Sequence, residues 1–233
     1  MRVTEAVAAT LAGLGADTLF GVVGSGNFHI TNALISQGAR YYPARHEGGA
    51  ACMADGWART ASRTGLLTVH QGPGLTNAVT GITEAAKSRT PLLVLAADVA
   101  GPAVSSNFRI DVPALAAAVG AVPERLHSPA SAAADTARAY QTAARQRRTV
   151  VLAMPLDVQA GECDRQPPPA APLLRPAAPA ADAADALAAA LARARRPVFV
   201  AGRGARVARA GPGLAELAAA CGALLATSAA AKG

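Results

Sequence analysis

The chain has 233 residues, of which 52% are hydrophobic and 16% are charged, so it can bury a sizeable core and lacks the composition of a disordered protein. Its net charge is +7, but the arginines are scattered and no basic run is interleaved with aromatic residues, which argues against a nucleic-acid partner. Its three cysteines, Cys52, Cys163 and Cys221, form no CxxC pair, which indicates a reduced, cytoplasmic protein without disulfides or a zinc site. No run of about 18 apolar residues lacks charge or glycine, so we expect no membrane span.

The first two thirds of the chain alternate between helical and extended patterns. Apolar spacing predicts a helix over 3–14 that ends near Gly15. Short apolar segments that read as strands follow at 18–23, 40–43, 66–70, 92–97 and 149–154. Alanine-rich helical stretches lie between most of them, at 28–37, 48–60, 75–87 and 130–146. This alternation predicts a mostly parallel α/β sheet with helices on both faces.

The remainder begins with a proline-rich stretch over 155–179, which reads as an extended linker. A second α/β pattern follows, with helices at 182–194 and 214–221, strands at 197–201 and 223–226, and a glycine-rich turn at 202–204. We therefore expect a first domain over 1–160, a linker over 161–180 and the start of a Rossmann-like second domain over 181–233. Two strands cannot close a core, so we expect the chain to be part of a longer protein.

Glycine clusters follow three of the predicted strands. They are Gly21…Gly24-Ser25-Gly26, Gly72-Pro73-Gly74 and Gly202-Arg203-Gly204. Glycines at such places let the backbone approach a ligand, and the next helix offers free N–H groups. His29 and Val207 stand where a dinucleotide fingerprint requires its third glycine. Each cluster alone is therefore better explained as a turn that has no chemical role.

A glutamate stands at the junction between the strand at 40–43 and the next helix. Glu47 follows Arg45-His46 and precedes Gly48-Gly49, so the small residues around it would admit a flat ligand. The helix dipole favours a carboxylate in this position. Glu47 is thus either a first-turn acid that stabilises the helix or part of a binding site.

Several motifs in one order resemble the pyrimidine-binding domain of thiamine-diphosphate enzymes, most closely the acetolactate synthase and pyruvate oxidase branch. The resemblance covers about residues 1–160. Its motifs are Phe20-Gly21…Gly24-Ser25-Gly26-Asn27, Arg45-His46-Glu47, Met53-Ala54-Asp55-Gly56-Trp57-Ala58-Arg59, Gly72-Pro73-Gly74…Thr76-Asn77 and Glu84-Ala85.

The resemblance implies that Glu47 hydrogen-bonds ring nitrogen N1′ of thiamine diphosphate and so activates the cofactor. The cofactor provides the electron sink, and the protein provides orientation and electrostatics. The remaining cofactor-binding positions that the resemblance implies are Gly24, Ser25, Gly72, Pro73, Gly74 and Asn77.

Two further places bear on the substrate. The resemblance makes His70 a candidate acid–base residue, as in some decarboxylases, although it is equally readable as a strand-end histidine bonded to backbone. His29 and His46 are weaker candidates. The resemblance places Phe108 and Arg109 on the substrate-facing loop, but acetolactate synthases carry glutamine where this chain has Arg109. That arginine either pairs with an acidic substrate or is solvated.

The Gly-Asp-Gly motif that holds Mg²⁺ and the diphosphate in this family is absent from the sequence. The resemblance therefore implies that Mg²⁺ lies outside this segment, on the diphosphate-binding domain of a partner subunit in a homodimer or homotetramer. FAD is a further cofactor of some relatives, bound through the central domain.

These observations favour the N-terminal part of an acetolactate-synthase-like carboligase that decarboxylates a 2-oxo acid. A 2-oxo-acid decarboxylase of the benzoylformate or pyruvate type is the alternative that His70 favours. Two further hypotheses are a truncated, non-catalytic cofactor-binding module and a nicotinamide-dependent oxidoreductase, and the incomplete glycine motifs count against the latter.

Overall fold

A computed structural model describes residues 1–164 and 177–232, so the proline run at 167–169 lies outside the described residues. The chain divides into two units, Met1–Pro172 and Leu173–Gly233. No helix in the described ranges is both long and apolar enough to cross a bilayer.

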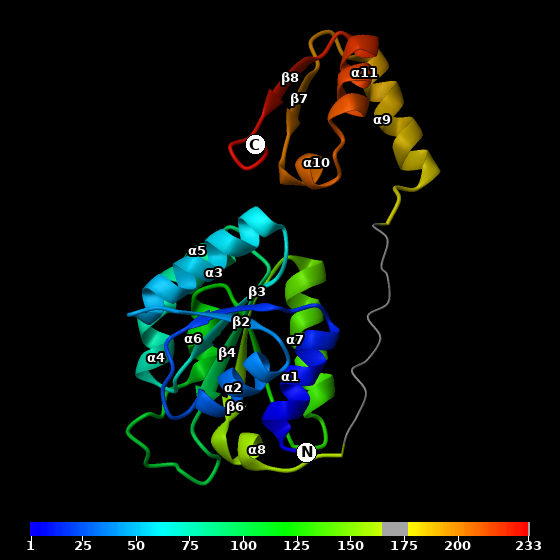
Figure 1. Ribbon diagram of the computed structural model, residues 1–233. Coiled ribbons are helices and arrows are strands. Elements are labelled where there is room, and N and C mark those ends of the chain that lie inside the picture. The colour runs from blue at the N-terminus through cyan, green and yellow to red at the C-terminus, as the bar shows by residue number, and fades with distance from the viewer. Residues whose placement is uncertain (165–176, 233) are drawn as a thin grey trace. The chain divides into compact units, whose positions relative to one another are not determined.

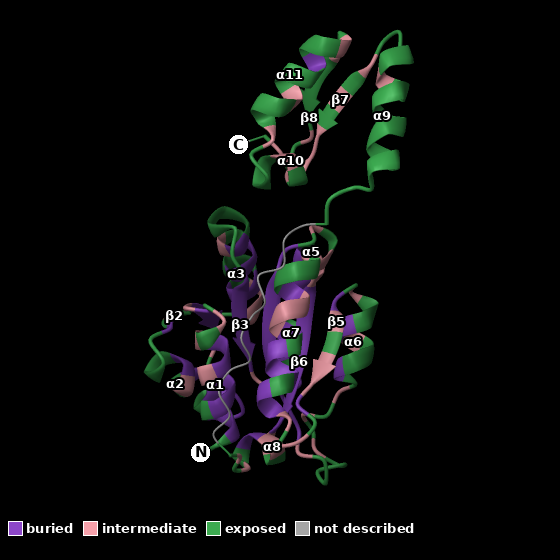
Figure 2. Ribbon diagram, turned by 90° about the vertical axis from the view of Figure 1, so that its right-hand side faces the viewer, coloured by how far each residue is buried: buried purple, intermediate pink, exposed green. Residues whose placement is uncertain are grey.

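The first unit contains a six-stranded parallel sheet with the strand order β2-β1-β3-β4-β6-β5 (Figure 1). In chain order the strands are β1 (Thr18–Gly21), β2 (Arg40–Pro43), β3 (Gly65–Val69), β4 (Leu92–Asp98), β5 (Val122–Arg125) and β6 (Thr149–Pro155). Every residue of β3, β4 and β6 is buried, and Figure 2 shows β3 and β6 in purple. Such strands occur where helices cover both faces of a sheet, and the predicted fold class is confirmed.

The helices of the first unit form two layers. One face of the sheet carries α1 (Val3–Gly13), α2 (Phe28–Ser36) and α7 (Ala132–Gln146); the other carries α3 (Glu47–Ala61), α5 (Val79–Lys87) and α6 (Val112–Ala118). Strand β4 contributes to both layers: Leu93 and Leu95 pack into the first core cluster, whereas Val94 and Ala96 pack into the second. This alternation follows from the period of two along a strand.

Some elements differ from the sequence-based expectation. Helix α6 and strand β5 occupy a stretch for which no element was predicted. Strand β5 contains Pro123 and lies at the edge of the sheet, where a missing N–H is tolerated. The single helix expected at 75–87 is two helices, α4 (Pro73–Asn77) and α5, because the chain turns at Ala78. Residues expected to be extended form the short helix α8 (Leu156–Ala160).

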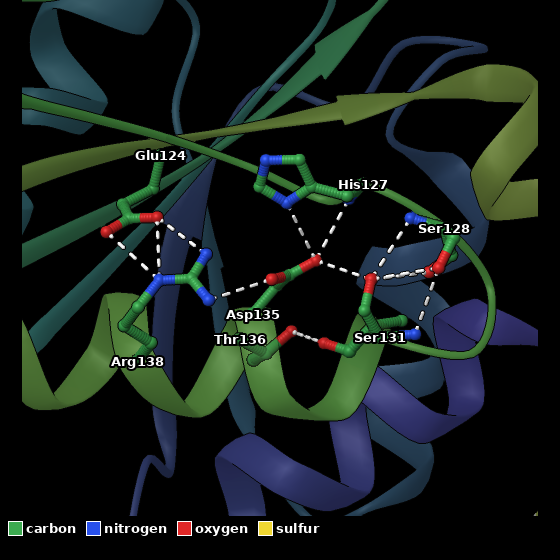
Figure 3. A network of polar contacts seen from close by, with 8 residues as sticks. Glu124, His127, Ser128, Ser131, Asp135, Thr136 and Arg138 are labelled. Atoms are coloured by element: carbon green, nitrogen blue, oxygen red, sulfur yellow. Dashed lines mark hydrogen bonds and ion pairs between the residues drawn. The ribbon is translucent and has the colours of Figure 1, made fainter.

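A network of polar side chains joins β5 to α7 (Figure 3). The buried carboxylate of Asp135 accepts hydrogen bonds from the backbone N–H of His127 at 2.9 Å and the hydroxyl of Ser131 at 2.8 Å. It also pairs with Arg138, which in turn binds Glu124. Burial raises the pKa of Asp135, but these donors outweigh it, so the pKa lies below its usual value. The network fixes the start of α7 over the sheet.

The second unit has a two-stranded parallel sheet of β7 (Val198–Ala201) and β8 (Leu224–Thr227). Its helices are α9 (Ala181–Arg193), α10 (Arg203–Val207) and α11 (Gly211–Cys221). The turn predicted at 202–204 is instead the start of α10, because Gly202 has extended backbone and caps the helix. Among the described residues of this unit only Ala218 is buried.

Candidate functional site

A crevice is expected where the connections of two adjacent strands leave toward opposite faces of a parallel sheet. Strands β1 and β3 are such a pair, because β1 leads into α2 on one face and β3 leads through α4 to α5 on the other. The loop after β1 carries Gly24 and Gly26, and His70 follows β3. The backbone N–H of Gly26 donates to Nδ1 of His70 at 3.1 Å, joining the two loops.

Asn27 holds the loop after β1 in place from inside the protein. Its side chain is fully buried. Its Oδ1 accepts from the backbone N–H of Gly24 at 2.7 Å, and its Nδ2 donates to the carbonyl of Val22 and the hydroxyl of Thr68, both at 3.0 Å. The sequence placed Asn27 within a motif but gave it no role, because its bond to Thr68 on β3 becomes visible only in the fold.

The imidazole of His70 is oriented by its surroundings. Because Nδ1 accepts a hydrogen bond, the hydrogen-bond pattern assigns the proton of the neutral ring to Nε2. Burial lowers the pKa of His70, and the charge of Glu47 partly opposes that shift. The ring of Phe108 lies edge-on at 5.2 Å between centroids. The site thus presents a neutral imidazole beside a carboxylate.

Glu47 is the first residue of α3 and is half-buried. Its Oε2 accepts a hydrogen bond from Nδ2 of Asn77 at 3.0 Å. Its Oε1 has no hydrogen-bond partner among the described residues. His46, considered a weaker candidate, caps the helix by accepting from the N–H of Gly48 at 3.0 Å. The carboxylate therefore lies at a positive helix end with one oxygen available to a ligand.

Two glycines of the turn after β3 are required by close packing. Gly72 has φ +60°, and a Cβ there would come within 2.6 Å of the carbonyl oxygen of Phe108. A Cβ at Gly74 would lie 3.0 Å from Cβ of His70 and 3.4 Å from Oε1 of Glu47. The two glycines thus let the turn pack closely against Phe108, His70 and the carboxylate of Glu47.

The remaining residues that the sequence predicted for the site are exposed. Ser25 and Pro73 are exposed on the same two turns. His29 is exposed on α2 and contacts Phe28. Arg109 lines a neighbouring cavity of about 580 Å³ whose lining includes neither Glu47 nor His70. Contacts therefore join Gly24, Glu47, His70, Gly72, Gly74, Asn77 and Phe108 in one site, without Arg109.

Gln71 is a residue near the site that the sequence did not single out. It is buried, and its Oε1 has no hydrogen-bond partner in the described residues. It packs so closely against Gly26 that any side chain there would collide with it. No sequence signal identifies this residue, because its contact depends on the pairing of the two loops.

A parallel sheet covered by helices on both faces, with Glu47 and His70 beyond the carboxyl ends of its strands, defines an α/β domain of the kind that binds ligands at that edge. The family model described as "Thiamine pyrophosphate enzyme, N-terminal TPP binding domain" matches residues 1–118, about half of the chain. The chain therefore belongs to the thiamine pyrophosphate enzymes, and the matched residues correspond to the N-terminal domain of that family.

Curated relatives resemble nearly the whole chain. A probable 2-ketoarginine decarboxylase of Pseudomonas aeruginosa is 36% identical over 98% of this chain and 42% of its own length. A sulfoacetaldehyde acetyltransferase of Rhodobacter capsulatus is 33% identical over 94% of this chain and 38% of its own. The large subunit of acetolactate synthase isozyme 2 of Escherichia coli is 30% identical over 72% of this chain. The chain thus spans less than half the length of these relatives.

A solved structure has the same fold. The thiamine diphosphate-dependent 4-hydroxybenzoylformate decarboxylase of Rhodococcus jostii RHA1 superposes with a TM-score of 0.88 over 98% of this chain and 44% of its own. Sequence identity is 23%, so this likeness bears on the fold alone.

Proposed function

We propose that this chain supplies the pyrimidine-binding half of an active site that decarboxylates a 2-oxo acid with thiamine diphosphate. One observation carries the proposal: Glu47 keeps a free carboxylate oxygen beside the glycine turn at Gly72 and Gly74, at the start of a helix. Family membership supports the cofactor. Glu47 would hold a proton at ring nitrogen N1′, and the cofactor, when bound, supplies the electron sink for decarboxylation.

The fit of the residues to the ring rests on packing. Gly74, which has no side chain, lets the turn lie close to both His70 and Glu47. Asn77 orients the carboxylate through Oε2 and leaves Oε1 for the ring. Gly24, Ser25 and Pro73 would border the ring from the two turns. Phe108 would wall the substrate side through its contact with His70.

The fate of the decarboxylated product distinguishes two candidate activities. Acetolactate-synthase-like carboligation is the leading proposal, because the relatives of this chain include an acetolactate synthase and an acetyltransferase. Release of an aldehyde by a 2-oxo-acid decarboxylase is favoured by His70, because its neutral ring carries a proton on Nε2 and could serve as a general acid. The product of a single turnover with one 2-oxo acid separates the two.

The diphosphate and Mg²⁺ are proposed to bind outside this segment, on a domain of a partner subunit, in a homodimer or homotetramer. FAD in the second unit is a separate hypothesis that visible flavin absorbance of the purified enzyme tests. Cytoplasmic location remains a prediction from the cysteine pattern.

The decisive experiment is hydrogen–deuterium exchange at C2 of thiamine diphosphate, measured with the diphosphate-binding domain present. We expect Glu47→Gln to lose most of the exchange, because an amide cannot share the proton of N1′. Glu216→Gln, an exposed glutamate on α11, is the matched control and should exchange normally. Normal exchange in the Glu47→Gln protein would remove the basis of the proposal.

A further inference from the structure

A second cavity lies at the carboxyl edge of the same sheet. It measures about 580 Å³, and its lining includes Asp98 at the end of β4, Arg125 at the end of β5 and Arg109 before α6. Strand β4 leads to α6 on one face, and the adjacent strand β6 leads to α8, whose Val158 packs on the other face. The same divergence occurs between β1 and β3, and such places are where open α/β sheets bind ligands. The size is that of a small-molecule site.

One arginine of this cavity is held in place. Nη1 of Arg125 contacts Oδ2 of Asp98 at 2.7 Å. The other oxygen of Asp98 accepts the backbone N–H of Val99 at 2.9 Å, so both oxygens of this nearly buried carboxylate are occupied. The remaining guanidinium N–H groups of Arg125 have no acceptor among the described residues. Arg125 is therefore a fixed cation with spare donors.

A second arginine has no partner. Arg109 is exposed, and its guanidinium forms no ion pair or hydrogen bond within the described parts of the chain. Asp111, the other acid of the lining, already accepts the backbone N–H of Ala114 at 2.9 Å and caps α6. Of these two carboxylates only one oxygen, on Asp111, makes no hydrogen bond among the described residues, so most N–H groups of the two arginines remain for acceptors that a ligand brings.

We propose that this cavity binds a small anion through a carboxylate or phosphate group, with Arg109 as the main contact and Arg125 as the second. The planar guanidinium suits both groups because it donates two parallel hydrogen bonds. The site is separate from the one that contains Glu47. Consecutive residues nevertheless contact the two sites, because Phe108 packs on His70 and Arg109 lines the cavity.

Calorimetric titration of the full chain tests the proposal, with inorganic phosphate and succinate as separate probes. We expect saturable millimolar or tighter binding of at least one probe, and the probe that binds identifies the group that the site prefers. Arg109→Gln should weaken binding about tenfold or more, because charge-assisted hydrogen bonds are lost. Arg89→Gln is the control, since Arg89 is exposed before β4 at the opposite edge of the sheet.

Backbone NMR shifts locate the bound anion independently. We expect the probe to shift the amides of Gly101 and Ile110 and to leave those of Gly24 and Gly26 unchanged. Absence of binding by both probes, equal binding by the Arg109→Gln protein, or shifts confined to the Gly24 loop would each overturn the proposal. The titration contains no thiamine diphosphate, so its outcome is independent of the role of Glu47.

Discussion

Strand β4 of the first unit buries all seven of its residues, whereas β8 of the second unit exposes all four. Both strands are apolar and both run parallel to a neighbour. The difference lies in the layers around them: β4 has helices on both faces and strands on both sides, while the second unit offers β8 one strand. Figure 2 shows this contrast as purple central strands against a largely green second unit.

The contrast teaches that the same local pattern yields different stability in different surroundings. Helix α9 contributes no buried residue to its unit, and Leu187, Val200 and Leu224 are exposed by 60%, 66% and 72%. Apolar surface left in water provides none of the burial free energy that holds a domain together. An exposed apolar sheet of this kind is the surface through which protein segments associate.

The largest effect should come from truncating a leucine within the first unit. Leu93 is fully buried in β4, so Leu93→Ala should lower the free energy of unfolding by about 2–5 kcal/mol. Leu224→Ala in β8 removes the same atoms from an exposed position and should change it by less than about 0.5 kcal/mol. Urea unfolding of both variants measures the difference, and equal losses would break the comparison.

A buried polar residue should have the next largest effect. Asn27→Ala removes the hydrogen-bond partner of the Gly24 N–H, the Val22 carbonyl and the Thr68 hydroxyl. It should lower the free energy of unfolding by about 1–3 kcal/mol. Urea unfolding again measures the cost. Asn107→Ala, at an exposed position, is the control. If the two variants were equally stable, the loop after β1 would not depend on its buried amide.

The smallest effect depends on pH. The pKa of Asp135 is lower in the folded chain than its ordinary value of 3.8, so its carboxylate contributes stability above that value and loses it as the pH falls through the folded pKa. Asp135→Asn should therefore flatten the loss of stability on acidification, measured by thermal unfolding across the acid range. Asp185→Asn, on exposed helix α9, should leave the curve unchanged; a similar flattening there would contradict the assignment.

The sequence allowed part of this architecture to be predicted. Long apolar strands and glycine clusters that follow them marked the sheet and brought Gly24, Glu47 and Gly72 into consideration, because strand ends of a parallel sheet share an edge. Strand β5 escaped prediction since it is short and contains Pro123. The cavity beside Arg109 also escaped, because it depends on β5 lying next to β6, and chain order does not reveal that pairing.

Strand β6 lies between β4 and β5 although it follows both in the sequence. During synthesis, β4 and β5 therefore lack the strand that joins them until residues 149–155 have left the exit tunnel of the ribosome. The start of α1 gains its last backbone partner later still, because the N–H of Val3 donates a hydrogen bond to the carbonyl of Gly161. Because such distant contacts form slowly, the sheet can be completed only after translation has passed α8, and its apolar central strands lack a full set of neighbours until then.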